Sequence, residues 1–135
     1  MSILKKNGIL NSEISKVLSD LGHTDEIVIA DAGLPIPDGV KKIDLAIDFS
    51  EPSFIRVLEL VLEDMKVESV LLAEEIRDKN PEQLSAVKNL LADEEEIWFV
   101  RHEDFKEKTQ DAKAVIRTGE ATPYSNIILQ AGVLF

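Results

Sequence analysis

Cysteine is absent from all 135 residues, which excludes disulfide bonds, thiolate metal ligands and a cysteine nucleophile. A chain without disulfides fits a reducing compartment, so we expect it in the cytoplasm. The first fourteen residues contain lysines but no sustained apolar segment or small-residue cleavage site, and no later run approaches the length of a membrane span. We therefore expect a soluble, unsecreted protein with no membrane partner.

Basic residues are also scarce: 15 lysines and arginines face 26 acidic residues, and the formal net charge is −11. A surface of this sign repels a phosphate backbone, so nucleic acid is not an expected partner. The sequence lacks the GxxxxGK[ST], GxGxxG, GxSxG and HExxH motifs of well-known nucleotide and hydrolytic sites. Its two histidines and scattered carboxylates follow no recognised ligand spacing. We therefore expect neither a metal nor a cofactor.

The length and the 44% apolar content suit one domain, which we expect to span residues 1–135. Hydrophobic spacing, caps and turn residues predict helices at 12–21, 52–65, 81–91 and, shorter, 102–112. Apolar or alternating runs predict strands at 26–31, 42–49, 67–73, 96–100, 113–118 and 126–135. Helices that alternate with strands favour an α/β fold: a three-layer domain with a largely parallel central sheet and flanking helices.

Polar residues follow several of the predicted strands. Asp31 and His102 come directly after strand-like runs, and the polar segment 117–126 joins the last two. Ligands gather at the carboxyl ends of strands in such sheets, so these distant parts of the sequence are candidates for one pocket. Together with Tyr124 and Asn126 they offer the donors and acceptors that sugar hydroxyls require. Taken alone, each also fits an ordinary turn or surface position.

Two long stretches resemble the signature regions of the D-ribose pyranase family, which is related to the fucose mutarotases. They are NGILNSEISKVLSDLGHTDEIVIADAGLPIP at 7–37 and VIRTGEATPYSNIILQAGVLF at 115–135. The segments KIDLAIDFSEPSF and LAEEI and the surroundings of His102 are similar too, so the resemblance covers essentially the whole chain.

The resemblance implies an isomerase that interconverts the β-pyranose and β-furanose forms of D-ribose by acid/base-catalysed ring opening, without a cofactor. It implies that His23, in the LGHTD motif, is the proton donor. It also implies that Asp31, His102, Tyr124, Ser125 and Asn126 form the sugar site. Arg117, Glu120 and Thr122 are then expected to fix the shape of their loop by hydrogen bonding.

The implied partners are D-ribose and further copies of the chain. Members of the family form ring-like homo-oligomers, decamers built from stacked rings, with the site between neighbouring subunits. From the residues alone, the apolar GVLF end fits either an interface or the edge of the core. Three other functions stay open: a mutarotase for fucose or another pentose, a non-catalytic sugar-binding module, and a structural assembly protein.

Overall fold

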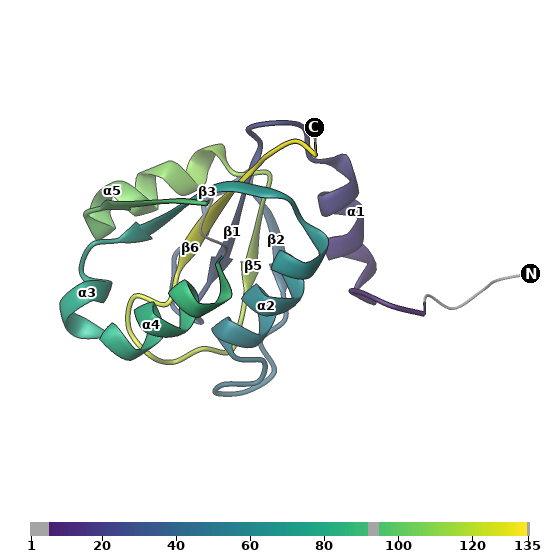
Figure 1. Cartoon of the computed structure of the whole chain (residues 1–135). Helices are drawn as coiled ribbons and strands as arrows, with labels where there is room; N and C mark the ends of the chain where they lie inside the picture. The colour runs from purple at the N-terminus through teal and green to yellow at the C-terminus, as the bar shows by residue number, and fades with distance from the viewer. Residues whose placement is uncertain (1–5, 92–94, 135) are drawn as a thin grey trace, which may run out of the picture.

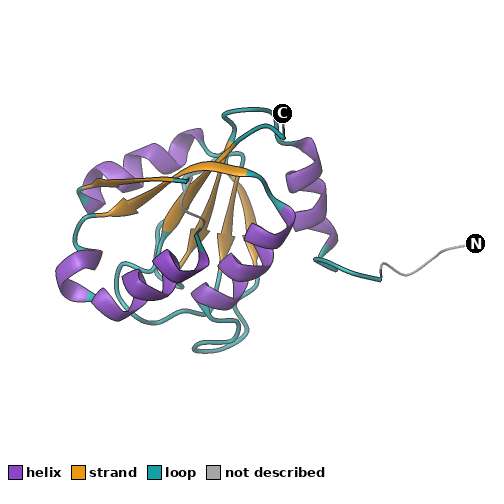
Figure 2. Ribbon diagram, viewed as in Figure 1, coloured by secondary structure: helices purple, strands orange, loops and turns teal. Residues whose placement is uncertain are grey.

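A six-stranded sheet forms the middle layer of the computed structural model, which describes residues 6–91 and 95–134 (Figure 1). The strands are β1 (Glu26–Ala30), β2 (Lys41–Asp44), β3 (Val67–Ala73), β4 (Glu96–Val100), β5 (Ala114–Arg117) and β6 (Ile127–Ala131). The helices are α1 (Ser12–Asp20), α2 (Phe54–Asp64), α3 (Ile76–Lys79), α4 (Pro81–Leu90) and α5 (His102–Lys108), followed by the 3₁₀ turn η1 (Thr109–Asp111). Figure 2 shows helices on both sides of the sheet, which confirms the predicted three-layer α/β fold.

The sheet is mixed, in the order β2-β5-β1-β6-β3-β4. β2, β5 and β1 are mutually parallel, as are β3 and β4, whereas β6 runs antiparallel to both β1 and β3. The loop between β5 and β6 covers only 118–126, and a crossover to a parallel strand needs about a dozen residues or more. The short loop therefore requires β6 to return in the opposite direction.

Each face of the sheet has its own core. On β1, Ile27 and Ile29 pack into the cluster that holds α1, α2 and α4, while Val28 and Ala30 pack into the cluster around Phe105 of α5. These four side chains are fully buried, as expected for a central strand covered on both faces. Among the described residues, none of the helices has both the length and the apolar content that crossing a bilayer requires.

Polar side chains start the three longer helices that cover one face. The side-chain oxygens of Asn11, Ser53 and Asn80 accept hydrogen bonds from main-chain N–H groups in the first turns of α1, α2 and α4. The prediction that Pro52 lies in the first turn of a helix was wrong, because Ser53 is the cap and α2 begins one residue later. The short helix α3 was not predicted.

Two predicted strands end at least four residues earlier in the structure. β2 ends at Asp44, where the carboxylate accepts a hydrogen bond from the N–H of Ala46 at 3.0 Å and the chain leaves the sheet. The alternating residues beyond it lie in a loop, so Ile47 and Phe49 are 85% and 77% exposed. β6 ends at Ala131, and Phe135 lies outside the described residues.

Gly119 lets the loop between β2 and α2 pack against the loop after β5. The N–H of Ser50 donates to the carbonyl of Gly119 at 2.7 Å, and the N–H of Gly119 donates to the carbonyl of Pro52 at 2.9 Å. A Cβ at Gly119 would overlap the carbonyl oxygen of Asp48 and lie 2.8 Å from the nitrogen of Glu51.

We therefore expect Gly119→Ala to lower the free energy of unfolding by about 1–3 kcal/mol, since main-chain atoms must move to admit the methyl group. Urea unfolding measures this change. Gly33→Ala is the matched control, because the nearest atom to its new Cβ lies at 3.9 Å. Equal stabilities for the two variants would contradict the close packing described for Gly119.

Candidate functional site

A cavity of about 440 Å³ opens at the carboxyl ends of the parallel strands. Asp31 follows β1 and His102 follows β4, while Tyr124 and Asn126 precede β6, which enters from the same edge because it is antiparallel. Asp31 and His102 therefore converge as predicted, but the polar segment 117–126 joins them through its end, while Arg117 at its start lines other cavities. The lining residues are Asp31, Gly33, Leu34, Pro35, His102, Lys106, Pro123, Tyr124 and Asn126. The volume lies within the range of about 300–1,000 Å³ that is usual for small-molecule sites.

Asp31 is held in a fixed orientation by Asn126. The side-chain oxygen of Asn126 accepts from the main-chain N–H of Asp31 at 2.8 Å, and its amide donates to the Asp31 carboxylate at 3.1 Å. The N–H of Gly33 donates to the other carboxylate oxygen at 3.1 Å. Asn126 is only 1% exposed, and both polar groups of its side chain hydrogen-bond to Asp31. It therefore positions the carboxylate that faces the cavity.

Burial raises the pKa of Asp31 above its ordinary value of 3.8. The hydrogen bonds from Gly33, Asn126 and Leu34 and the proximity of His102 act against this rise. A carboxylate with a raised pKa is a stronger base than an exposed aspartate, which suits a group that accepts protons from hydroxyls.

The raised pKa of Asp31 also makes the stability of the folded protein depend on pH. The folded protein binds the Asp31 proton more tightly than the unfolded chain does, so this stabilisation is complete below the unfolded pKa and is lost as the pH rises through the folded one. We expect wild type to gain stability relative to Asp31→Asn as the pH falls from neutral toward 3.8. Urea unfolding of both proteins across that interval measures this change, and a wild type that loses stability relative to Asp31→Asn toward acid would contradict the assignment.

His102 and Tyr124 form the aromatic part of the lining. Their rings meet edge to face, with centroids 5.1 Å apart and an interplanar angle of 84°. The backbone of Tyr124 is left-handed, with φ of 57°, a conformation that costs about 1 kcal/mol or more for a residue with a Cβ. Nδ1 of His102 is buried and has no hydrogen-bond partner among the described residues. Strain and an unpartnered buried polar atom are both typical of functional sites.

Two residues that the sequence analysis did not single out belong to this site. Both carboxylate oxygens of Glu75 accept from the main-chain N–H of His102, at 3.0 and 3.1 Å, and fix the start of α5. Lys106 lines the cavity and forms an ion pair with Glu103 at 3.0 Å. Lys106 lies four residues after His102 on a predicted helix, and residues at this spacing share a helix face. This spacing could have indicated Lys106 from the sequence.

Ser125 lies beside the cavity but does not line it. The residue is fully buried, and its hydroxyl accepts from the side chain of Gln83 at 3.0 Å and shares a hydrogen bond with Thr122 at 2.9 Å. Thr122 also donates to Glu120 at 2.8 Å. The Ser125 hydroxyl is therefore occupied within the protein.

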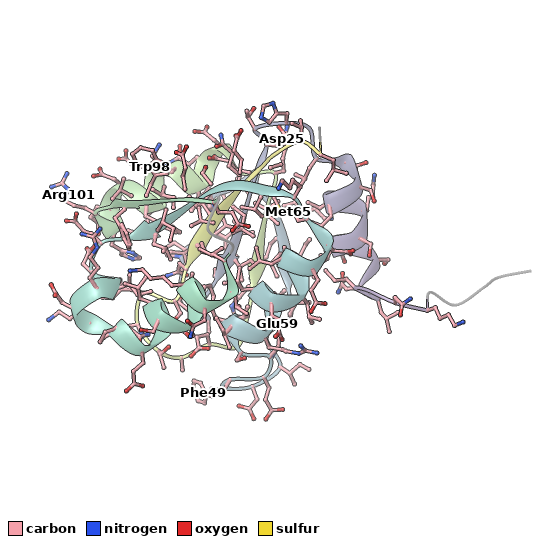
Figure 3. The ribbon with its side chains drawn as sticks, in the orientation of Figure 1. Asp25, Phe49, Glu59, Met65, Trp98 and Arg101 are labelled. Carbon is pink, nitrogen blue, oxygen red and sulfur yellow. The ribbon has the colours of Figure 1, made fainter. Side chains whose placement is uncertain are left out.

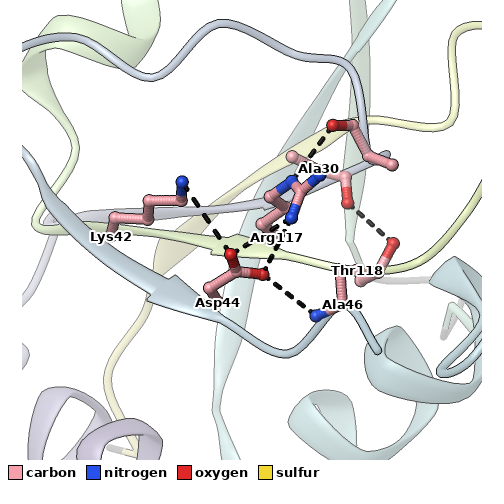
Figure 4. A network of polar contacts seen from close by, with 7 residues as sticks. Ala30, Lys42, Asp44, Ala46, Arg117 and Thr118 are labelled. Carbon is pink, nitrogen blue, oxygen red and sulfur yellow. Dashed lines mark hydrogen bonds and ion pairs between the residues drawn. The ribbon is translucent and has the colours of Figure 1, made fainter. Parts of the chain in front are cut away.

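Arg117 fixes the other end of the same loop. Its guanidinium donates to the carboxylate of Asp44, at 3.1 and 3.2 Å, and to the carbonyl of Ala32, at 3.1 Å. Figure 4 shows the pair of Arg117 and Asp44. The hydroxyl of Thr118 donates to the carbonyl of Ala30 at 2.8 Å. These contacts, with those of Glu120 and Thr122, confirm that the polar residues of this loop hold its shape.

His23 lies at the opposite edge of the sheet. It precedes β1, whereas Asp31 follows β1, and a five-residue strand alone spans about 16 Å. In Figure 3, Asp25 of the same turn is at the top of the molecule, and Phe49, in the loop beyond β2, is at the bottom. One chain therefore brings together Asp31, His102, Tyr124 and Asn126, and it holds His23 apart from them.

The cavity offers a carboxylate, a phenol, an imidazole and an ammonium beside the apolar surfaces of Leu34 and Pro35. This combination suits a small ring that carries hydroxyl groups at its edge and C–H groups on its faces. Among the residues that the structure describes, no three histidine or acidic side chains lie close enough to hold a metal ion.

Comparisons with known proteins agree with the resemblance to the D-ribose pyranase family. The chain matches the model of the RbsD / FucU transport protein family over residues 4–134. A D-ribose pyranase from Bacillus cytotoxicus is 59% identical over 132 residues, which is 98% of this chain and all of the relative. The structure of Bacillus subtilis RbsD complexed with D-ribose superposes with a TM-score of 0.93 at 58% identity, covering 97% of this chain and 99% of the other.

A fucose mutarotase from Streptococcus pneumoniae, solved in complex with L-fucose, is more distant. It has a TM-score of 0.76 and 28% identity, and the match covers 93% of this chain and 94% of the other. The family model spans nearly the whole chain, and the similar proteins match it over nearly their full lengths. The chain belongs to the RbsD / FucU transport protein family.

Proposed function

We propose that the chain is a D-ribose pyranase, acting throughout residues 1–135 as one sugar ring-isomerase domain. It interconverts the β-pyranose and β-furanose forms of D-ribose. The observation that carries the proposal is the cavity with Asp31, His102 and Tyr124, in a chain 58% identical to an RbsD that was solved with D-ribose. Curated D-ribose pyranases at 58–59% identity over 98% of the chain support the same activity.

The reaction requires only proton transfers. When the ring opens, the bond between C1 and the ring oxygen breaks, its electron pair stays on the ring oxygen, and that oxygen takes a proton from His23. The anomeric hydroxyl passes its proton to Asp31, and the released electron pair completes the aldehyde C=O. Rotation then brings a different hydroxyl to the carbonyl, and the reverse transfers close the other ring. Positioned acid/base groups of this kind contribute about a hundred- to ten-thousandfold in rate.

The remaining cavity residues hold the sugar. Tyr124 and His102 bind hydroxyls and the transient aldehyde, while Asn126 acts chiefly by orienting Asp31 through two hydrogen bonds. Ser125 contributes through its main chain, since its hydroxyl is bonded to Gln83 and Thr122.

His23 reaches the sugar from a neighbouring subunit. Within one chain the length of β1 separates His23 from the cavity, so a site that uses both needs two copies of the chain. The proposed assembly is the ring-like homo-oligomer of the family, a decamer of stacked rings. Large apolar side chains exposed on the single chain, which include Trp98 at 58% and Phe49 at 77%, are candidates for burial between copies. Light scattering tests this point, and a fully active monomer of 15.0 kDa would contradict it.

The activity itself is tested by NMR magnetisation exchange between the ring forms of D-ribose. We expect the wild-type protein to accelerate exchange between pyranose and furanose signals. Tight binding without any acceleration would favour a non-catalytic sugar-binding module instead.

A mutarotase for fucose or another pentose is the second candidate. The structural match to a fucose mutarotase favours it, although the identity of 28% is about half of that to RbsD. Running L-fucose and D-ribose in the same exchange measurement separates the two, and we expect the larger acceleration with D-ribose.

A further inference from the structure

A histidine–carboxylate pair lies at the sheet edge opposite the cavity. Nε2 of His23 is 3.2 Å from a carboxylate oxygen of Glu68, and both side chains are 47% exposed. An ion pair this exposed contributes little to stability, because solvent screens it. The effect of the pair that matters here is therefore the orientation of the His23 imidazole.

The backbone that carries His23 is fixed from both sides. The N–H of Gly22 donates to the carboxylate of Asp25 at 2.8 Å, and the N–H of Asp25 returns to the carbonyl of Gly22 at 3.1 Å. Thr24 takes a left-handed conformation, with φ of 75°, and its N–H donates to the carbonyl of Ala131 at the end of β6. His23 therefore sits in a closed turn that is tied to the sheet.

Glu68 is placed by an irregularity in β3. Val67 pairs with Ala131 and Ser69 pairs with Gln130, so Glu68 is an extra residue in the ladder. A bulge of this kind bends a strand and redirects a side chain, and bulges recur next to active sites.

Gly132 leaves room for the bulge. A Cβ at Gly132 would lie 3.3 Å from Cβ of Glu68, and the N–H of Gly132 donates to the carbonyl of Lys66 at 2.9 Å. The backbone of both partners is thus arranged so that the Glu68 carboxylate reaches the His23 ring.

We propose that Glu68 is the positioning residue of His23. This inference rests on the proposed function, because it concerns the group that transfers the proton. An ionised carboxylate only accepts hydrogen bonds, so it keeps a proton on Nε2 and fixes the ring plane. When both ring nitrogens are protonated, Nδ1 gives its proton to the sugar ring oxygen, which leaves the neutral ring with its proton on Nε2, and Nδ1 takes the proton back on closure.

Ribose exchange by NMR and titration with ribose test the effect on the reaction. We expect Glu68→Ala to lower the exchange rate at saturating ribose by about tenfold or more, with ribose affinity and melting temperature unchanged. Glu68→Gln keeps an acceptor oxygen and should lose less. Glu63→Ala is the matched control, since it removes an exposed acidic side chain at the end of α2, just before β3, and should leave the rate unchanged.

Two further measurements separate positioning from a general structural role. In a His23→Ala background, Glu68→Ala should lower the rate no further, because Glu68 acts through the missing imidazole. Two-bond ¹H–¹⁵N correlation spectra of the His23 ring should show the neutral form protonated on Nε2 in wild type, with this preference reduced in Glu68→Ala.

Wild-type exchange by Glu68→Ala, or an unchanged distribution of the His23 ring proton, would overturn the inference while leaving the proposed function in place. If the wild-type protein does not accelerate ribose exchange, the proposed function fails instead. The ring-proton spectra still test the pairing in that case.

Discussion

Replacing His23 with alanine is expected to remove the acid that opens the sugar ring. The catalysed rate of pyranose–furanose exchange should fall by about a hundred- to ten-thousandfold, the usual contribution of a positioned acid or base. Ribose binding should survive, because the cavity proposed to hold the sugar lies at the other end of β1. Magnetisation exchange and equilibrium titration with D-ribose measure the two quantities separately.

The exchange rate of His23→Ala can be compared with that of wild type only if the variant keeps its fold and its assembly. His23 is half exposed, and among the described residues its side chain hydrogen-bonds only with Glu68, so its loss should leave the melting temperature and the oligomer mass unchanged. A His23→Ala protein that folds, binds ribose and exchanges it at the wild-type rate would remove His23 from the mechanism.

Replacing Asp31 with alanine is expected to weaken ribose binding about ten- to a hundredfold. A hydrogen bond to a charged group contributes about 1.5–3 kcal/mol, and each 1.4 kcal/mol is a factor of ten in affinity. The change also leaves the buried amide of Asn126 without its acceptor, which disturbs the cavity further. Calorimetric titration with D-ribose measures the affinity.

Asp38→Ala is the matched control for this experiment. Asp38 carries the same charge and lies in the loop that follows Asp31, but it is exposed and lines a different cavity. We expect its ribose affinity to equal that of wild type. Equal losses in both variants would indicate a general effect of charge and would contradict a direct contact by Asp31.

The position of the site was predictable because parallel strands end at a common edge. Asp31 and His102 each follow an apolar run, and no knowledge of the strand order was needed to expect them at the same side of the sheet. Tyr124 and Asn126 reached this edge for a different reason, since they precede a strand that runs the other way. The direction of β6 was not predicted, and only the shortness of the loop before it carried that information.

Other features depend on contacts between distant parts of the chain. Ile47 and Phe49 continue the alternation of β2, yet contacts with the loop at Gly119 draw the chain out of the sheet. The sequence also does not tell which way a loop side chain points. Ser125 lies between Tyr124 and Asn126 in the sequence, but its hydroxyl faces the buried network with Gln83.

His23 and the cavity lie at opposite ends of β1, so a site that uses both needs two copies of the chain. A strand places its two ends at opposite edges, so LGHTD and IADAGLP are close in sequence and distant in space, although β1 alone joins them. Each proposed ribose site therefore takes His23 from one subunit and Asp31 from another.

Mixing two variants that each lack one of these residues tests the shared site most directly. His23→Ala and Asp31→Ala subunits are unfolded together, refolded together and assayed by ribose magnetisation exchange, with each variant refolded alone as the control. Random assembly gives about a quarter of the sites an intact His23 and an intact Asp31 from different chains, so we predict that about a quarter of the wild-type rate returns. A mixture that stays as inactive as the separate variants, in mixed oligomers verified by mass spectrometry, would contradict a shared site.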